Sequence, residues 1–201
     1  MIHPKTELRF INDEIGYGVV ATDFIPKGTI TWVLDKLDRE FTPSQVAEMD
    51  NLYQSIMDIY SYRNRQGNYV LCWDNGRFVN HSFNSNCFTT AYDFEIAIRD
   101  IYPGEQLTDD YGYLNISEPF RASPEGTKRK VVYPDDLVKY SKVWDKKLVS
   151  PFKRIPKVEQ PLKTLISQEK WDMIFKISAG QMEMESLSTL YFPQEYKKMV
   201  G

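Results

Sequence analysis

The chain has 201 residues, of which 42% are hydrophobic and 14% aromatic, and its formal net charge is −3. This apolar content can offset the entropy lost on folding, so extensive disorder is excluded, and the length fits one domain or one domain with a small annex. Charges at Lys5, Glu7 and Arg9 exclude a signal peptide or a membrane span at the N-terminus. We therefore expect a cytoplasmic protein without membrane contact.

The first part of the chain alternates turns with short β-type segments. Residues 15–22 and 29–34, joined by the turn Pro26-Lys27-Gly28, predict a hairpin. Thr42 followed by Pro43 predicts the start of a helix, and apolar residues at spacings of three or four extend one amphipathic helix to about residue 58. Further short strands are predicted at residues 69–73, 88–92 and 95–99.

The amino-acid composition changes after residue 120. Pro, Lys and Arg dominate as far as Pro161, and residues 162–177 place apolar side chains at near-helical spacing. We therefore divide the chain into a mostly β part with α, residues 1–120, and a basic, mainly helical C-terminal extension, residues 121–201.

The charges are unevenly distributed between these parts. Residues 1–120 hold 9 Lys/Arg against 18 Asp/Glu, whereas residues 121–170 hold 13 against 6. The acidic part favours an encounter with a basic peptide, although an ordinary solvated surface explains it equally well.

Three separated segments need a common explanation. They are Gly16-Tyr17-Gly18, the run from Arg77 to Cys87 that contains Asn80-His81-Ser82, and the run from Gly104 to Tyr113 that contains Asp110-Tyr111-Gly112. Taken singly each is weak, because a Gly-x-Gly in a β-rich region is more often a tight turn than a ligand loop, and Asn-His-Ser is compatible with a hydrogen-bonded turn.

In this order and at these separations, the segments resemble the three hallmark motifs of the SET-domain protein-lysine methyltransferases. The resemblance covers roughly residues 7–120, and residues 114–120 faintly resemble the tails that follow this domain in bacterial members. It implies a SET-domain fold of small curved sheets, in which the segment of Asn80-His81 and the segment ending in Tyr111 interlock as a pseudoknot.

The resemblance also implies S-adenosylmethionine as cofactor and methyl transfer to a lysine amine of a protein or peptide. The backbone of Gly16, Tyr17 and Gly18 would meet the methionine portion, the Asn80 side chain its amino-acid tail and the His81 backbone the adenine. Arg77 and Phe78 would line the same site. Tyr111 corresponds to the family's catalytic tyrosine, which orients the amine and the methyl group, and it would also border the cofactor.

This sequence departs from the family pattern where many members bind zinc. Phe83 stands where those members have cysteine after Asn-His-Ser, and no cysteine follows residue 111, so we expect no metal. Cys72 and Cys87 are far from any CxxC pairing. We expect Phe120 and the C-terminal extension to close the lysine channel and Phe120 to border the cofactor, although Phe120 is equally compatible with plain core.

The substrate channel is predicted from Leu34, Thr89 and Tyr113. Leu34 falls where family members commonly have an aromatic residue, and Thr89 falls where Phe or Tyr limits the number of methyl groups added. Because Thr is small, we expect a roomier pocket that favours di- or trimethylation.

Two alternative functions remain open at this stage. The first is a non-catalytic SET fold that binds a peptide or the cofactor as an interaction module, which the departures at Leu34 and Thr89 favour. The second is nucleic-acid binding by the basic segment, where aromatic residues are interleaved with basic ones. The residues concerned are Lys128, Arg129, Lys130, Lys146, Lys147, Lys153 and Arg154, with Tyr133, Tyr140 and Trp144. A solvated helical surface with its aromatics turned inward is the simpler interpretation of that segment.

Overall fold

The protein is described here by a computed structural model, which covers residues 1–194. In this range the strands form five small sheets instead of one large one. They are β1 (Thr6–Asn12) with β2 (Gly16–Ala21); β3 (Ile30–Val33), β9 (Phe94–Ala97) and β8 (Cys87–Thr89); β4 (Arg39–Phe41), β6 (Tyr69–Leu71) and β5 (Ser61–Arg63); β10 (Thr108–Asp109) with β7 (Asn80–His81); and β11 (Phe120–Arg121) with β12 (Val131–Val132).

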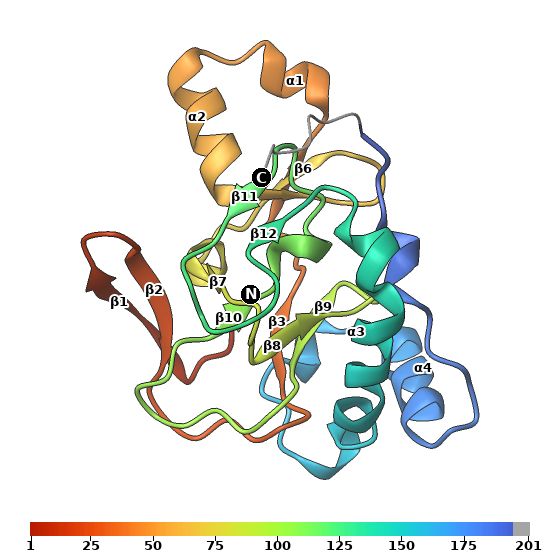
Figure 1. Ribbon diagram of the computed structural model, residues 1–201. Coiled ribbons are helices and arrows are strands. Elements are labelled where there is room, and N and C mark those ends of the chain that lie inside the picture. The colour runs from red at the N-terminus through yellow and green to blue at the C-terminus, as the bar shows by residue number, and fades with distance from the viewer. Residues whose placement is uncertain (195–201) are drawn as a thin grey trace.

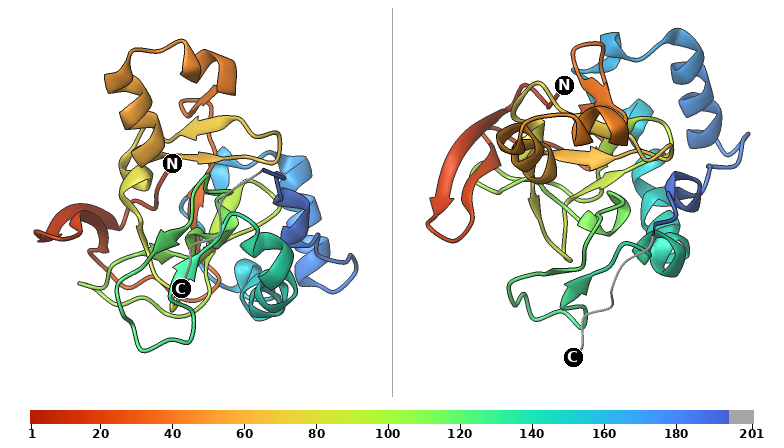
Figure 2. Two further views of the ribbon diagram at one scale, coloured as in Figure 1. Left: turned by 45° about the horizontal axis from the view of Figure 1, so that its top comes forward. Right: turned by 90° about the horizontal axis from the view of Figure 1, so that it is seen from above.

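The helices lie around these sheets (Figure 1). Helices α3 and α4 lie on the opposite side of the molecule from the β1–β2 hairpin, and α1 and α2 form a separate projection, as the turned views in Figure 2 also show. The α-helices are α1 (Pro43–Ala47), α2 (Asn51–Tyr60), α3 (Asp136–Phe152) and α4 (Gln168–Ser178). Short 3-10 turns occur at η1 (Asn75–Phe78), η2 (Tyr111–Tyr113), η3 (Ile155–Lys157), η4 (Lys163–Leu165) and η5 (Leu187–Leu190). None of the helices within residues 1–194 is long and apolar enough to cross a membrane.

The largest hydrophobic core joins the two parts of the chain. Phe88 and Phe94 of the central sheet belong to one buried cluster with Trp144 and Leu148 of α3 and Trp171 of α4. Burying side chains of this size stabilises the fold by about 2 kcal/mol each. The mainly helical character of the extension is therefore as expected, and its helices cover the sheet of β3, β9 and β8.

The predicted hairpin of residues 15–22 and 29–34 is wrong. Strands form at both places, and the turn exists, since the Thr29 amide donates to the Pro26 carbonyl at 3.1 Å. However, β2 pairs antiparallel with β1, while β3 pairs with β9, far along the chain. Apolar periodicity locates strands, but the choice of partner depends on tertiary packing that a local pattern does not contain.

The single helix predicted for residues 43–58 is two helices. Its start is as predicted: Thr42 caps α1 by accepting from the Gln45 amide, and Gln45 accepts from the Thr42 amide in return. The chain leaves the helix after Ala47 and begins α2 at Asn51, with Asp50 in an extended conformation. Asp50 occupies the N-cap of α2, where Asp is favoured, but its side chain makes no capping hydrogen bond.

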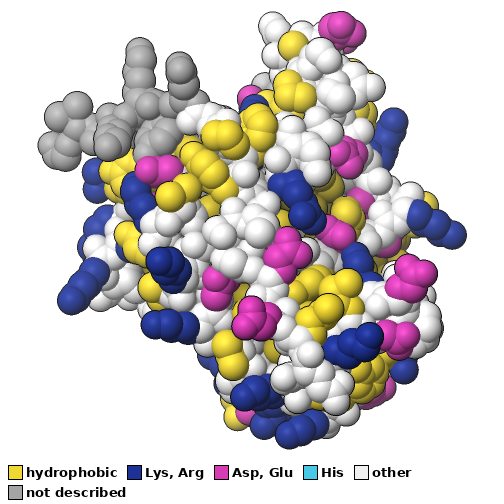
Figure 3. Space-filling view, turned by 90° about the vertical axis from the view of Figure 1, so that its right-hand side faces the viewer, with side chains coloured by type: hydrophobic (Ala, Val, Ile, Leu, Met, Phe, Trp, Pro, Cys, Tyr) yellow, Lys and Arg dark blue, Asp and Glu magenta, His cyan; other side chains and the backbone are white. Residues whose placement is uncertain are grey.

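The surface over α3 and α4 is mixed in charge. Figure 3, which faces this side, shows basic side chains scattered singly among acidic and hydrophobic ones. Trp144 is only 2% exposed and packs against Tyr140, while Arg129 forms ion pairs with Asp110 and Asp136. Trp144 and Arg129, two members of the interleaved basic and aromatic set, are therefore engaged in internal contacts.

Candidate active site

The three sequence segments meet at one place in the structure. Asn80, in β7, donates from its side-chain amide to the Tyr17 carbonyl at 3.0 Å and to the Gln106 side chain at 3.2 Å. A β-carbon at Gly18 would lie 2.7 Å from the Asn80 amide nitrogen, so the second glycine of the motif is required by this close approach. Gly16 has a φ of +76°, which explains the first glycine.

The segments of Asn80-His81 and Tyr111 lie side by side through a parallel strand pair. Asn80 is opposite Thr108 and His81 is opposite Asp109, and the Ser82 amide donates to the Asp109 carbonyl at 2.8 Å. The Tyr111 amide donates to His81 Nδ1 at 3.2 Å. Residues 30 apart in the chain are thus brought into one site, as the interlocked arrangement requires.

The His81 ring is enclosed by aromatic side chains. Its centroid lies 4.5 Å from that of Phe83, 5.3 Å from Tyr111 and 5.6 Å from Phe120. Burial lowers the pKa of His81, so the ring is neutral at neutral pH. Since Nδ1 accepts a hydrogen bond, the proton sits on Nε2, which is buried without a partner in the described part of the chain.

The Tyr111 hydroxyl is fixed by the backbone beside the site. It donates to the Val79 carbonyl at 2.8 Å, and burial raises the pKa of the phenol, so it stays protonated. Because the hydroxyl hydrogen is engaged by Val79, the oxygen lone pairs remain available to accept a hydrogen bond.

The segment after Phe120 covers the face of β7. Phe120 is 42% exposed and pairs with Val132 in the hairpin of β11 and β12. The Glu125 carboxylate accepts hydrogen bonds from the Ser82 hydroxyl and the Phe83 amide, both at 3.0 Å. Phe83 itself is buried in a small cluster with Ala122 and Val132. An apolar contact therefore stands where zinc-binding relatives would have a cysteine.

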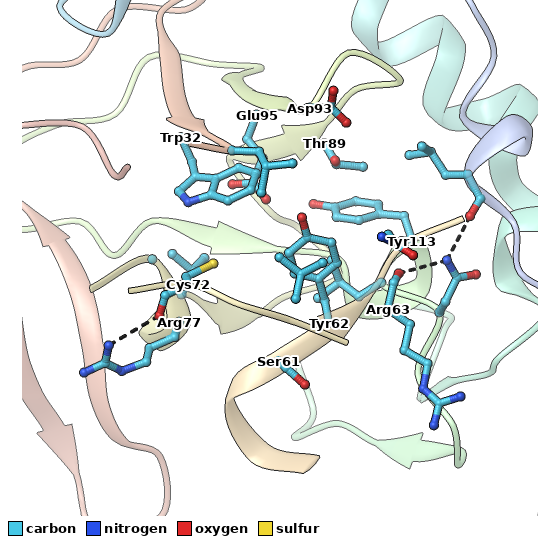
Figure 4. A pocket seen from close by; sticks show the side chains of 18 of the residues that line it. Trp32, Ser61, Tyr62, Arg63, Cys72, Arg77, Thr89, Asp93, Glu95 and Tyr113 are labelled. Carbon is cyan, nitrogen blue, oxygen red and sulfur yellow. Dashed lines mark hydrogen bonds between the residues drawn. The ribbon is translucent and has the colours of Figure 1, made fainter. Parts of the chain in front are cut away.

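The three residues predicted for the substrate channel line one cavity. Leu34, Thr89 and Tyr113 border a cavity of about 380 Å³, which Trp32 and Tyr62 also line (Figure 4). A second cavity of about 340 Å³ is bordered by Tyr111 and Phe120. The two cavities share the wall residues Ser61, Tyr62, Arg63, Leu114 and Asn115.

The roles expected for Arg77 and Phe78 are less direct. The Arg77 guanidinium donates to the Trp73 carbonyl at 2.9 Å and lies over the Phe78 ring at 4.9 Å, while Phe78 meets the Tyr60 ring edge to face at 5.4 Å. Arg77 lines the channel cavity, and Phe78 packs against the core that contains Val79. Both side chains support the segment that leads into β7.

Within residues 1–194, no three His, Cys, Asp or Glu side chains are grouped so that they could hold a metal ion. Cys72 and Cys87 are both buried free thiols. Burial raises the pKa of each thiol, so neither is ionised at neutral pH.

The sequence analysis missed several polar residues around the site. Gln106 holds Asn80, and the Asn86 side chain donates to the Gln106 carbonyl at 2.7 Å and accepts from the Thr108 amide at 2.9 Å. Asp109, which is buried, and Glu95, which is half-buried, form a carboxyl pair next to Tyr113. The doublet Asp109-Asp110 before Tyr111 was a visible signal, whereas nothing in the sequence marks Glu95.

Comparison with known proteins agrees with this geometry. Residues 16–112, slightly less than half of the chain, match the family model of the SET domain. The search of curated proteins found no match. Among the solved structures that match is a candidate histone methyltransferase of Plasmodium falciparum, 18% identical, with a TM-score of 0.40, covering 55% of this chain and 95% of that one. A likeness at this level adds nothing to the assignment.

Residues 16–112 therefore form a SET domain. SET domains are generally methyltransferase domains that use S-adenosylmethionine. The helical extension that follows packs into the same core as the domain's central sheet.

Proposed function

We propose that this chain is an S-adenosylmethionine-dependent protein-lysine methyltransferase. One observation carries the proposal: a hydrogen bond joins Asn80 to the Tyr17 carbonyl of the Gly16-Tyr17-Gly18 segment, while a hydrogen bond to His81 and the parallel pair of β7 and β10 bring Tyr111 to the same place. A site assembled from segments so far apart in the chain is not explained by local turns.

The residues around β7 fit the cofactor chemically. Its methionine tail needs polar anchors and close-approaching backbone, which the Asn80 amide and the two glycines offer. Its adenine needs flat apolar surface, and Phe120 and Tyr17 are both substantially exposed beside this segment. When bound, S-adenosylmethionine supplies an electrophilic methyl group on a cationic sulfur.

The chain's own residues position the amine. Tyr111 offers its oxygen as an acceptor beside Val79, which also lines the channel cavity. At the point of transfer, burial beside Leu34 and Thr89 and the nearby cationic sulfur of a bound cofactor favour the neutral form of a lysine, whose free pKa is about 10.4. Positioning supplies most of the rate acceleration, because charge is only redistributed along the line of transfer.

The first experiment is a calorimetric titration of the purified protein with S-adenosylmethionine, followed by methyl transfer to a panel of lysine peptides. The wild type is expected to bind one equivalent. Asn80→Ala should bind roughly ten-fold or more weakly, since it loses a side-chain hydrogen-bonding group at the proposed cofactor tail. Asn84→Ala, at an exposed position four residues later, is the matched control and should bind like the wild type.

Tyr111→Phe separates binding from turnover. The variant should keep the cofactor affinity and lose at least about a hundred-fold in turnover, because the oxygen that orients the amine is removed together with its hydrogen bond to the Val79 carbonyl. Full turnover in Tyr111→Phe would contradict the catalytic role. A wild type that binds cofactor but methylates no lysine peptide would favour the interaction module, which the departures from the family pattern at Leu34 and Thr89 keep as the second candidate.

The proposal also covers the number of methyl groups that are added and the cellular compartment in which the protein acts. The 380 Å³ cavity with Thr89 in its wall supports di- or trimethylation, to be read by mass spectrometry of the peptide product. The two buried free thiols are compatible with a reducing compartment such as the cytoplasm.

A further inference from the structure

Polar groups converge on the channel cavity from separate elements. Figure 4 shows the hydroxyls of Tyr62 and Tyr113 and the carboxyl group of Glu95 pointing toward the same region of the cavity. Tyr62 comes from β5, Glu95 from β9 and Tyr113 from η2. Such convergence of polar groups from separate elements on one cavity is the arrangement expected of a ligand site.

Glu95 does not act as an isolated carboxyl group. It is hydrogen-bonded to Asp109, and the Tyr113 hydroxyl donates to Asp109 Oδ1 at 2.8 Å. Burial raises the pKa of both carboxyls, that of Asp109 to about 6, because two neighbouring carboxylates cannot both ionise away from water. The pair therefore holds one proton, on Glu95, and one negative charge, on Asp109.

The negative charge has no cationic side chain opposite it. No Lys or Arg among residues 1–194 forms an ion pair with Glu95 or Asp109. Three arginines line the cavity: Arg63 and Arg77 point away from Glu95 (Figure 4), and Arg65 pairs with Glu185 at 3.8 Å. Arg63 donates to the Tyr69 hydroxyl, and Arg77 donates to backbone carbonyls. An uncompensated buried charge is costly, so this cavity suits a cation from outside the chain.

Two further polar atoms at the cavity lack partners. The Tyr62 hydroxyl makes no hydrogen bond in the described part of the chain, although burial raises its pKa and keeps it protonated. Trp32 is 6% exposed, and its indole Nε1 is buried without a partner. Buried polar groups are rarely left unpaired without a reason, and a polar ligand in the cavity would supply one.

We propose that this cavity takes the ammonium end of the substrate lysine and that the Glu95–Asp109 pair accepts its proton before methyl transfer. This inference rests on the proposed function. One N–H bond of the ammonium breaks, and its electron pair stays on nitrogen. The proton passes to the free oxygen of Glu95 while the proton already on Glu95 moves to Asp109. The pair is then doubly protonated and neutral, and the amine is neutral with its lone pair free.

The neutral amine then lies where the Tyr111 oxygen can orient it. Tyr111 lines the second cavity, which shares a wall with this one, and its hydroxyl donates to the carbonyl of Val79, which lines the channel cavity. The proton acceptor and the transfer site therefore lie on adjoining cavities. After methyl transfer the pair returns its extra proton to water as the product leaves. Glu95 would touch the substrate, while Asp109 would act through Glu95.

The test uses n-butylamine, a mimic of the lysine side chain, titrated into the wild type and the Glu95→Gln variant without cofactor. Wild type should bind, and Glu95→Gln should bind roughly ten-fold or more weakly, because the amide cannot take a proton. Asp93→Asn is the matched control. Asp93 lines the same cavity but is exposed and paired with Lys170 at 2.8 Å, so its loss should leave butylamine affinity unchanged.

Infrared difference spectra report the protonation of the carboxyl pair directly. A purely structural role of Glu95 would leave this protonation signal unchanged. Butylamine binding to the wild type should increase the carbonyl absorption of protonated carboxylic acid, since the pair gains a second proton. The increase should be absent in Glu95→Gln and absent when n-butanol replaces butylamine. Asp109→Asn, which keeps an oxygen for Tyr113, is the second variant, to be used if Glu95→Gln does not fold. It too should bind butylamine more weakly and show no increase in the carboxylic acid absorption.

Two results would overturn the inference: a wild type that does not bind butylamine, or Glu95→Gln and Asp109→Asn variants that bind it as tightly as the wild type. Neither depends on the cofactor. If S-adenosylmethionine fails to bind while butylamine gives the expected pattern, the proposed function is wrong and the amine site stands.

Discussion

Gly18 shows how much of the site depends on single residues. Its backbone passes so close to Asn80 and Gln106 that a β-carbon would lie 2.7 and 2.6 Å from their polar atoms. The glycine pattern in the sequence located this position. The partner Gln106 could not be predicted, because the contact arises only when β2 meets the segment before β10.

His3 supplies a pH dependence at the residue scale. Its ring is buried and accepts from the Lys5 amide at 3.2 Å, and burial, aided by the charge of Lys5, lowers its pKa to about 4 from 6.5. Because the folded pKa is the lower one, the stabilising contribution is complete above pH 6.5 and is lost as pH falls toward 4. The loss should reach up to about 3 kcal/mol.

The measurement is urea unfolding of wild type and His3→Asn between pH 4 and 7, in which Asn keeps an acceptor for Lys5. The stability difference between the two proteins should shift against the wild type as the solution is acidified. Asp109 acts in the opposite direction, since its raised pKa removes stability as pH increases to about 6, but it is present in both proteins and cancels. A difference that does not change with pH would contradict the assignment.

At the scale of elements, the sequence predicts the positions of the strands and the start of α1 correctly, but it does not predict which strands pair. The Thr42 cap and the strand positions follow from propensity and period, which act within a few residues. The partners of β2 and β3 are fixed by packing between distant segments. The bounds of α3 were not predicted within the mainly helical extension, because its lysines obscure a stripe of buried residues that includes Leu137, Trp144 and Leu148.

Arg129 connects three elements, so we expect its replacement to affect both stability and turnover. Its guanidinium bridges Asp110, which caps η2 just before Tyr111, and Asp136 at the start of α3, and it lies over the rings of Phe83 and Tyr140. Arg129→Gln would leave two buried carboxylates without their cation. We expect a loss of about 3 kcal/mol in unfolding free energy.

Urea unfolding of Arg129→Gln measures this loss of stability. Methyl-transfer assays measure whether turnover also falls, because Asp110 caps η2 just before Tyr111 and would lose its cationic partner. Lys128→Gln removes the same charge from an exposed neighbour and should change neither quantity appreciably. Equal stability of Arg129→Gln and wild type would show that the ion pairs of Arg129 do not contribute to stability.

At the scale of the whole molecule, the extension and the SET domain share one hydrophobic core. Leu148 of α3 is 1% exposed in the same cluster as Phe88 and Phe94 of the central sheet. The division at residue 120 that the sequence suggested marks a change of composition, and we propose that the two parts unfold together. A composition pattern cannot reveal which surfaces will be joined.

Leu148→Ala tests that proposal. The truncation should destabilise the entire chain by about 2–5 kcal/mol in a single transition seen equally by circular dichroism and fluorescence. Val149→Ala, which changes the adjacent exposed side chain, should cost much less. Two separate transitions, with only one shifted by Leu148→Ala, would show that the extension folds independently.

The parallel pairing of β7 with β10 has a consequence for how the protein is made. Asn80 and His81 leave the ribosome well before Thr108 and Asp109, their strand partners, and before Phe120, which covers them. The proposed cofactor pocket therefore has no complete precursor in a nascent chain that stops short of these residues. Because loop closure must precede such distant pairing, the site is expected to form among the last events of folding, once the SET domain has been fully translated.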